Sequence, residues 1–123
     1  MSHIVKSKVE MKNKGCLLKA AEALGLQHLG NKTHTLYNRQ TAAGHGFKLP
    51  DWKYAVVINT DTGEAKYDNY GGAWGKQVEL DKLVQEYSLR VAEEQALMSG
   101  FTSERQLQEN GDIELNMTAL VSN

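Results

Sequence analysis

The chain has 123 residues, of which 41% are hydrophobic and 24% charged, and its formal net charge is −1. This balance excludes a disordered chain, while the single proline and single cysteine exclude a proline-rich linker and an intramolecular disulfide. Because it has neither a signal-peptide core nor an apolar run near the ~20 residues of a membrane helix, we expect a soluble, cytoplasmic protein. This length favours one domain over residues 1–123.

The first third of the chain predicts a strand followed by a helix. Polar and apolar residues alternate over residues 3–11, as in a half-buried strand. Asn13 can cap a helix whose apolar residues recur at helical spacing up to Leu24, and Gly25 can end it in a left-handed conformation. The next segment is ambiguous: residues 26–29 and 33–37 are interpreted as short strands, and residues 43–50 as a loop or sheet edge.

The middle of the chain predicts a hairpin. Residues 52–59 form the most convincing strand, and a run of apolar residues within it suggests that both faces are covered. Residues 60–64 are expected to turn with Gly63 at positive φ, and residues 65–70 to return as the second strand. A glycine-rich stretch over residues 71–75 then precedes a helix.

The last third predicts a long helix and a second hairpin. A helix over residues 77–99, stopped by Gly100, would carry an apolar stripe made of Leu80, Leu83, Val84, Tyr87, Val91 and Met98. In the hairpin, a three-residue loop at 109–111 is favoured over a two-residue loop. It pairs Leu107 with Ile113 and places Arg105, Leu107, Ile113, Leu115 and Met117 on one face. Together, the elements predict an α+β fold: a two-layer sandwich of an antiparallel-rich sheet of about five to six strands with two helices on one face.

Several short motifs occur in a recognisable order. They are Met1-Ser2-His3, Leu24-Gly25, Tyr37-Asn38-Arg39-Gln40, Tyr67-Asp68, Trp74-Gly75, Gly100-Phe101, and Asn110-Gly111 followed by Asp112 to Leu115. In this order the chain resembles the hypothetical chloroplast reading frame thirty-five family, a domain of unknown function found in plastids, cyanobacteria, other bacteria and phages. The resemblance implies one α+β domain without an established activity. The chain departs from the family in lacking its acidic residue and paired aromatics before Gly75 and its tryptophan near the C-terminus.

The residue pattern gives no support for a metal site or a catalytic centre. The histidines His28, His34 and His45 lack the short spacing of zinc ligands, and Cys16 falls on the inner face of a predicted helix. No nucleophile elbow or Walker motif is present, so we expect no enzyme, no metal and no cofactor. The glycine pairs near His45 and Trp74 could expose amides to an anion, but turns that need glycine are the favoured interpretation.

Basic, amide and aromatic residues are concentrated in two segments of the chain. Residues 1–59 contain nine Lys or Arg against three Asp or Glu, whereas residues 60–123 contain five against twelve. This asymmetry indicates either an anion-binding face or two halves that neutralise each other within the fold or between subunits. If residues 30–50 and residues 67–76 meet, they form a candidate ligand-binding site of Lys32, His34, Tyr37, Asn38, Arg39, Gln40, His45, Lys48, Tyr67, Tyr70 and Trp74.

Two functions remain open from the sequence. The favoured one is a non-enzymatic accessory or adaptor protein that binds a protein partner and self-associates, because an open sheet edge readily adds a strand. The alternative is a nucleotide or single-stranded nucleic-acid binding protein, with basic groups on phosphates and aromatic rings on bases. A phage-encoded, host-directed protein is compatible with either function, and neither requires a membrane.

Overall fold

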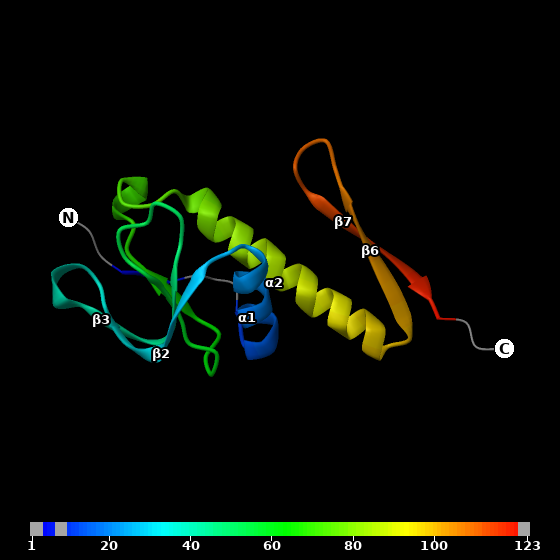
Figure 1. The fold of residues 1–123 in the computed structure, drawn as a ribbon, viewed down its shortest axis with the longest axis horizontal. Helices are drawn as coiled ribbons and strands as arrows, with labels where there is room; N and C mark the ends of the chain where they lie inside the picture. Colours follow the sequence, from blue (N-terminus) through cyan, green and yellow to red (C-terminus); the bar gives the residue numbers. More distant parts are fainter. Residues whose placement is uncertain (1–3, 7–9, 121–123) are drawn as a thin grey trace. The chain divides into compact units, whose positions relative to one another are not determined.

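The computed structural model describes residues 4–6 and 10–120, and within them the chain divides into two compact units (Figure 1). The first unit extends to Tyr87 and the second begins at Ser88. Both contain antiparallel strands, and the described residues also form two α-helices and two short 3-10 helices. The α+β class predicted from the sequence is therefore confirmed. No helix in the described part of the chain is long and apolar enough to cross a membrane.

The first unit is built on a five-stranded antiparallel sheet with the strand order β1-β5-β4-β3-β2. Its strands are β1 (Val5–Lys6), β2 (Gln27–Thr35), β3 (Thr41–Lys48), β4 (Val56–Ile58) and β5 (Ala65–Tyr67). Of the strand predicted over residues 3–11, Val5–Lys6 form β1, residues 4, 10 and 11 are not in a strand, and residues 3 and 7–9 lie outside the described residues. The two short strands expected at 26–29 and 33–37 are instead the single strand β2, which has an irregular register between His28 and Gly30.

The prediction of a loop or sheet edge at residues 43–50 was wrong, because β3 lies inside the sheet between β4 and β2. Its glycines hide the strand pattern. A Cβ atom on Gly44 would lie 2.5 Å from the carbonyl oxygen of Ile58, and one on Gly46 would lie 2.5 Å from the His34 ring. These glycines permit close packing of the neighbouring chain and ring, so β3 loses the alternation of apolar side chains that identifies a strand.

The helix α1 (Lys14–Ala23) forms as its capping residues predict. The Asn13 side-chain oxygen accepts a hydrogen bond from the Cys16 amide at 3.0 Å, and Gly25 follows the helix with φ = 69°. The apolar side of α1 is buried in the first unit through Cys16, Leu17, Ala20 and Ala21.

The turn between β4 and β5 also follows the sequence pattern. Gly63 has φ = 81°, and its amide donates to the Asn59 carbonyl oxygen at 2.7 Å. Asn59 additionally accepts from the Asp61 amide through its side chain at 2.9 Å. The strands themselves are shorter than the predicted ranges 52–59 and 65–70. The residues on either side of β4 and β5 are therefore left to form loops, and these loops build the site described below.

The helix α2 (Gln77–Met98) begins in the first unit and ends in the second. Leu80, Leu83 and Tyr87 of the predicted stripe are buried, and the Tyr87 hydroxyl accepts a hydrogen bond from the Asn13 amide at 3.0 Å. The stripe does not reach its predicted end, because Met98 is 80% exposed. Gly100 follows the helix with φ = 87°, as expected.

In the second unit, β6 (Phe101–Leu107) and β7 (Ile113–Ala119) form a separate two-stranded sheet that returns beside the end of α2 (Figure 1). Leu107 pairs with Ile113, and Gly111 has φ = 91°. The register predicted from the odd-numbered loop is therefore confirmed. The hairpin is tied to α2 by Arg105, whose guanidinium donates to both carboxylate oxygens of Glu93 at 3.0 and 2.8 Å.

Candidate binding surface

Four aromatic side chains from separate segments of the first unit form one cluster, called here the aromatic surface. Tyr37 belongs to the short helix η1 (Tyr37–Arg39), Tyr70 to the short helix η2 (Tyr70–Gly72), and Tyr54 and Trp74 lie in loops. The Trp74 ring is central: its centroid lies 5.0 Å from Tyr37, 5.6 Å from Tyr54 and 4.7 Å from Tyr70. The two segments that the sequence analysis required to meet, 30–50 and 67–76, are thus in contact through their rings.

A cation completes the aromatic surface. The Lys53 ammonium nitrogen lies 4.7 Å from the centroid of Trp74 and 5.7 Å from that of Tyr54. At such distances the electron-rich face of an aromatic ring attracts a positive charge. The Lys53 backbone amide also donates to the Trp74 carbonyl oxygen at 2.8 Å, which fixes the segment carrying the cation against the segment carrying the indole.

The aromatic surface is accessible to solvent. Tyr70 is 47% exposed and Tyr37 38% exposed, although both rings are large and apolar. Trp74 and Tyr54 are half-buried beneath them. A continuous set of exposed aromatic rings is unusual on a protein surface that faces only water, and it is typical of binding sites.

The loop that carries Tyr70 and Trp74 packs against the side chain of Trp52. The Trp52 ring is buried, and its Nε1 donates to the Lys76 carbonyl oxygen at 3.0 Å. Gly75 lies directly against this ring, so closely that a Cβ atom would come within 2.3 Å of it. Within the loop, the Asn69 side chain donates to the Gly75 carbonyl oxygen at 3.2 Å. The sequence analysis assigned Trp52 only to a strand, and its role as the support of this loop was not recognised.

Strained backbone surrounds the aromatic surface. Among the described residues, the non-glycine residues with positive φ are Asn38, Arg39, Asp51 and Tyr70, with φ between 49° and 62°. Asn38 and Arg39 follow Tyr37 in the sequence, and Asp51 lies two residues before Lys53. Tyr70 belongs to the aromatic surface itself. Such conformations cost of order 1 kcal/mol or more per residue, and they are concentrated at functional sites.

The structure brings together only some of the residues predicted to bind a ligand. Tyr37, Tyr70 and Trp74 meet, and Asn38 and Arg39 lie exposed in η1 beside Tyr37. The partly buried Gln40 follows η1 and donates its amide to the Tyr37 carbonyl oxygen. The remaining residues lie elsewhere: Lys32 on β2 and Lys48 on β3 are exposed along the hairpin, Tyr67 is buried edge-on against Trp52, and His34 and His45 are buried in the sheet.

The buried histidines make contacts within the protein. The Nε2 atom of His34 lies 3.0 Å from the Gly30 carbonyl oxygen and 3.2 Å from that of Gly44, to which it can donate. His45 shares a hydrogen bond of 3.0 Å with His28, and their rings are stacked. Burial lowers the pKa of His45 below its ordinary value of 6.5, and the nearby charges of His28 and Lys14 lower it further. His45 is therefore a neutral part of the core at neutral pH.

Among the described residues of the first unit, the buried side-chain atoms His45 Nε2 and Asp68 Oδ2 have no hydrogen-bond partner. Asp68 Oδ1 accepts from the Tyr70 amide at 3.1 Å and so supports the positive φ of Tyr70. The described residues contain no group of three or more His, Cys, Asp or Glu side chains that could hold a metal ion.

The glycine-rich segments do not present their amides to an anion. Gly44 and Gly46 belong to β3 inside the sheet, where strands on both sides pair with it. In the second segment, the Gly72 and Trp74 amides donate to the Asn69 carbonyl oxygen, and the Ala73 amide donates to that of Tyr70. Gly71 and Gly72 lie in the turn of η2, in agreement with the interpretation favoured from the sequence, whereas Gly44 and Gly46 lie in a strand and not in the turn that this interpretation expected.

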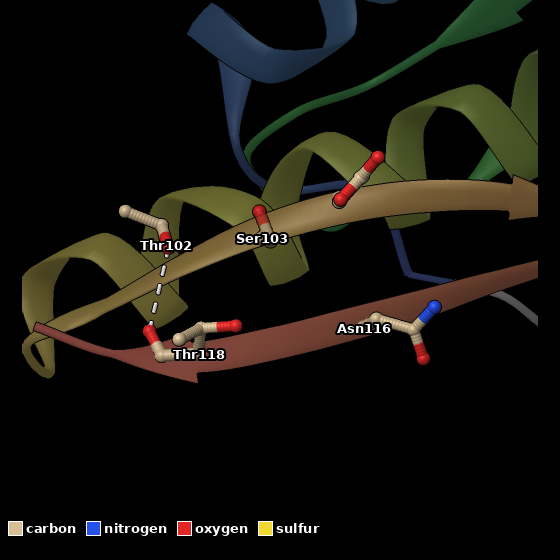
Figure 2. A pocket seen from close by; sticks show the side chains of 5 residues that line it. Thr102, Ser103, Asn116 and Thr118 are labelled. Atoms are coloured by element: carbon tan, nitrogen blue, oxygen red, sulfur yellow. Dashed lines mark hydrogen bonds between the residues drawn. The ribbon is translucent and has the colours of Figure 1, made fainter.

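A shallow hollow also occurs on the polar face of the β6–β7 hairpin (Figure 2). It is lined by Thr102, Ser103, Glu104, Asn116 and Thr118, and the Thr102 hydroxyl donates to the Thr118 carbonyl oxygen at 3.4 Å. Its lining has no aromatic ring and no basic group. It therefore offers less to a ligand than the aromatic surface does.

The sequence analysis missed Lys53 and Tyr54 as members of the site. They were placed inside the strand expected at 52–59, where they would have alternated between the two faces of the sheet. The observed strand begins only at Val56. Pro50 was the sequence signal for a later start of the strand, because a proline just before an expected strand favours a turn.

Comparison of the chain with protein-family models, with curated proteins and with solved structures finds no match. The resemblance drawn from the short motifs accordingly stays a prediction. The geometry of the aromatic surface is the evidence from which a function can be proposed.

Proposed function

We propose that this protein is a non-enzymatic adaptor that binds a partner protein through its aromatic surface. The observation that carries the proposal is the exposed Tyr70 ring stacked on Trp74, with the exposed Tyr37 ring in tilted contact with the same indole and Lys53 over it. Tyrosine, tryptophan and arginine are enriched among the residues that dominate the binding energy of protein interfaces, and the two aromatic residues bury a large area while losing little side-chain entropy. Arg39, exposed beside Tyr37, adds the third of these residue types.

The distribution of basic groups favours a protein partner over a nucleic acid. A single-stranded nucleic acid is bound by bases stacked on rings and by cations that follow the phosphates. Of the basic residues predicted to contact phosphate, Arg39 is beside the rings. Lys32 and Lys48 lie along the hairpin instead, and His45 is buried in the sheet. The cation that the structure adds at the rings is Lys53, whose ammonium faces the Trp74 indole.

The backbone strain supports the same proposal. A left-handed residue is retained where its side chain must point in a direction that a relaxed backbone would not allow. Tyr70, with φ = 49°, is held in that conformation by Asp68 and stacks on Trp74. These contacts hold the Tyr70 ring in one orientation, which would reduce the entropy lost when a partner docks.

The test compares variants of exposed residues inside and outside the aromatic surface. Tyr70→Ala and Tyr37→Ala each remove an exposed ring, whereas Val78→Ala removes an equally accessible apolar side chain from α2. Tagged wild type and variants are mixed with an extract of the native host, and retained proteins are quantified by mass spectrometry. We expect a partner that wild type and Val78→Ala retain and that both tyrosine variants lose.

The nucleic-acid alternative is measured on the same proteins. Binding of labelled single-stranded oligonucleotides that weakens steeply with salt and is lost in Tyr70→Ala would replace the proposal with that alternative. Equal retention of every partner by the wild type and the tyrosine variants would overturn the role of the aromatic surface.

A further inference from the structure

The second unit exposes an unusual amount of apolar surface. Leu107 is 73% exposed and Met117 51% exposed, on the face of the hairpin where Arg105 pairs with Glu93 of α2. Of the β7 residues on this face, Met117 and Ala119 are exposed, and Ile113 and Leu115 are partly buried. A two-stranded sheet is only marginally stable in water unless further strands or a helix extend it.

The outer edge of β7 presents a regular row of backbone groups. The Gln108 amide donates to the Asp112 carbonyl oxygen, and the Leu120 amide to that of Gly100, so even-numbered residues of this strand bond to β6. The alternation of an antiparallel pair directs the backbone groups of the odd-numbered residues outward. These residues are Ile113, Leu115, Met117 and Ala119, and no other described strand pairs with them.

The sequence of β7 leaves this edge unprotected. Natural edge strands are blunted by lysine, proline, bulges or inward-pointing charges. Within Ile113–Ala119 the single charged residue is Glu114, and there is neither a proline nor a lysine. The β6 edge differs, because a centred antiparallel pairing of two β6 strands would place Glu104 opposite Glu104 of the other copy.

We propose that β7 pairs antiparallel with β7 of a second copy of this chain, across a two-fold axis at Asn116. This register makes hydrogen-bonded pairs of Leu115 with Met117 of the second copy and of Ile113 with Ala119, so all four outward-facing residues find partners. Glu114 then faces Thr118 of the second copy, and no like charges are opposed. The result is a four-stranded sheet in which the apolar side chains of the two β7 strands lie side by side on one face, and it does not depend on the aromatic surface of the first unit.

The register is tested by changing the residue opposite Glu114. Thr118 is exposed, and the hydrogen bond from Thr102 reaches its backbone oxygen and not its side chain, so substitutions there leave the hairpin intact. Thr118→Glu places two like-charge pairs in the dimer and is expected to raise its dissociation constant between about twofold and thirtyfold. Thr118→Lys is the matched control and should dimerise at least as tightly as wild type. Glu114→Lys combined with Thr118→Glu should restore the affinity.

Dissociation constants are measured by light scattering and analytical ultracentrifugation, with circular dichroism as the control for folding. A second variant tests the axis itself. Asn116→Cys brings two thiols together in a non-hydrogen-bonded pair, with Cα atoms about 4.5 Å apart, within the range that a disulfide spans. Under oxidation it should yield a covalent dimer, whereas Thr102→Cys on β6 should not. A protein that stays monomeric up to about 1 mM overturns the proposal. Equal changes in the dissociation constant of the dimer in Thr118→Glu and Thr118→Lys would also overturn it.

Discussion

The Tyr70 ring lies nearly parallel to the indole of Trp74, with centroids 4.7 Å apart and planes inclined by 22°. Tyr70 reaches this position only because its backbone is left-handed and its amide is bonded to the buried carboxylate of Asp68. A strained residue thus places an exposed ring on a half-buried one.

Replacing Tyr70 should weaken the stack without unfolding the protein. A stacked aromatic pair contributes about 0.5–1.5 kcal/mol beyond area burial, so Tyr70→Ala should lower the free energy of unfolding by about 1 kcal/mol. Tyr70→Phe keeps the ring and should leave stability nearly unchanged. Urea denaturation followed by tryptophan fluorescence measures both. Equal stability of the alanine and phenylalanine variants would show that the stack contributes nothing in solution.

Removing strain at Arg39 should stabilise the fold and impair binding. Arg39 has φ = 62°, a conformation that costs a residue with a Cβ atom about 1 kcal/mol or more. In Arg39→Gly, the relief of strain is partly offset by the greater entropy of glycine in the unfolded state. We therefore expect the free energy of unfolding to increase by about 0.5 kcal/mol. Arg39→Ala keeps the Cβ atom and should show no gain. The comparison of the two variants by thermal denaturation separates backbone strain from loss of the guanidinium, and partner retention should fall in both.

Gly46 should not tolerate a side chain while His34 is present. A methyl group at position 46 would lie 2.5 Å from the His34 ring, so Gly46→Ala should destabilise the protein by about 1–3 kcal/mol. His34→Ala removes the obstructing ring, and the double variant should therefore be less destabilised than the sum of the single ones. Additive losses in this cycle would mean that the ring and the glycine do not interact.

Stability should fall as the medium becomes acidic because of His45. Its pKa in the folded protein is lowered below 6.5, chiefly by burial and then by the charges of His28 and Lys14. Above pH 6.5, His45 is neutral in both the folded and the unfolded state, and its full contribution to the free energy of unfolding is present. As the pH falls from that value through the folded pKa, the unfolded state binds the proton more tightly, and stability is lost. Urea unfolding from about pH 7.5 to about pH 5 should show a shallower dependence in His45→Gln; an unchanged slope would contradict this assignment.

The local structure of the chain is predictable because short-range rules decide it. Asn13 and Gly25 mark the ends of α1, and the parity of the loop before Ile113 determines the register of the second hairpin. The strand β3 was not predicted, because Gly44 and Gly46 are required by close packing against groups distant in the sequence. Gly44 lies against the Ile58 carbonyl oxygen, and Gly46 lies against the His34 ring. Long-range packing of this kind leaves no periodic signal.

The candidate site was only partly predictable for the same reason. Tyr37 and Trp74 were expected to meet, and their rings are in contact. The histidines were assigned to the site from their side-chain chemistry, yet His34 and His45 are buried in the sheet. Lys53 enters the site because its loop is bonded to the Trp74 carbonyl, an interaction that no spacing in the sequence reveals.

Photo-cross-linking from the aromatic surface tests the central proposal most directly. A photoreactive phenylalanine analogue is placed at position 70 in one protein and at the exposed position 78 of α2 in another, and both are irradiated in an extract of the native host. The proposed function predicts a discrete protein adduct from position 70 that is absent from position 78. Competition by an excess of unlabelled wild type should suppress this adduct, and Tyr37→Ala should not. Adducts that form equally from both positions, or a nucleic-acid adduct in place of a protein one, would contradict the account.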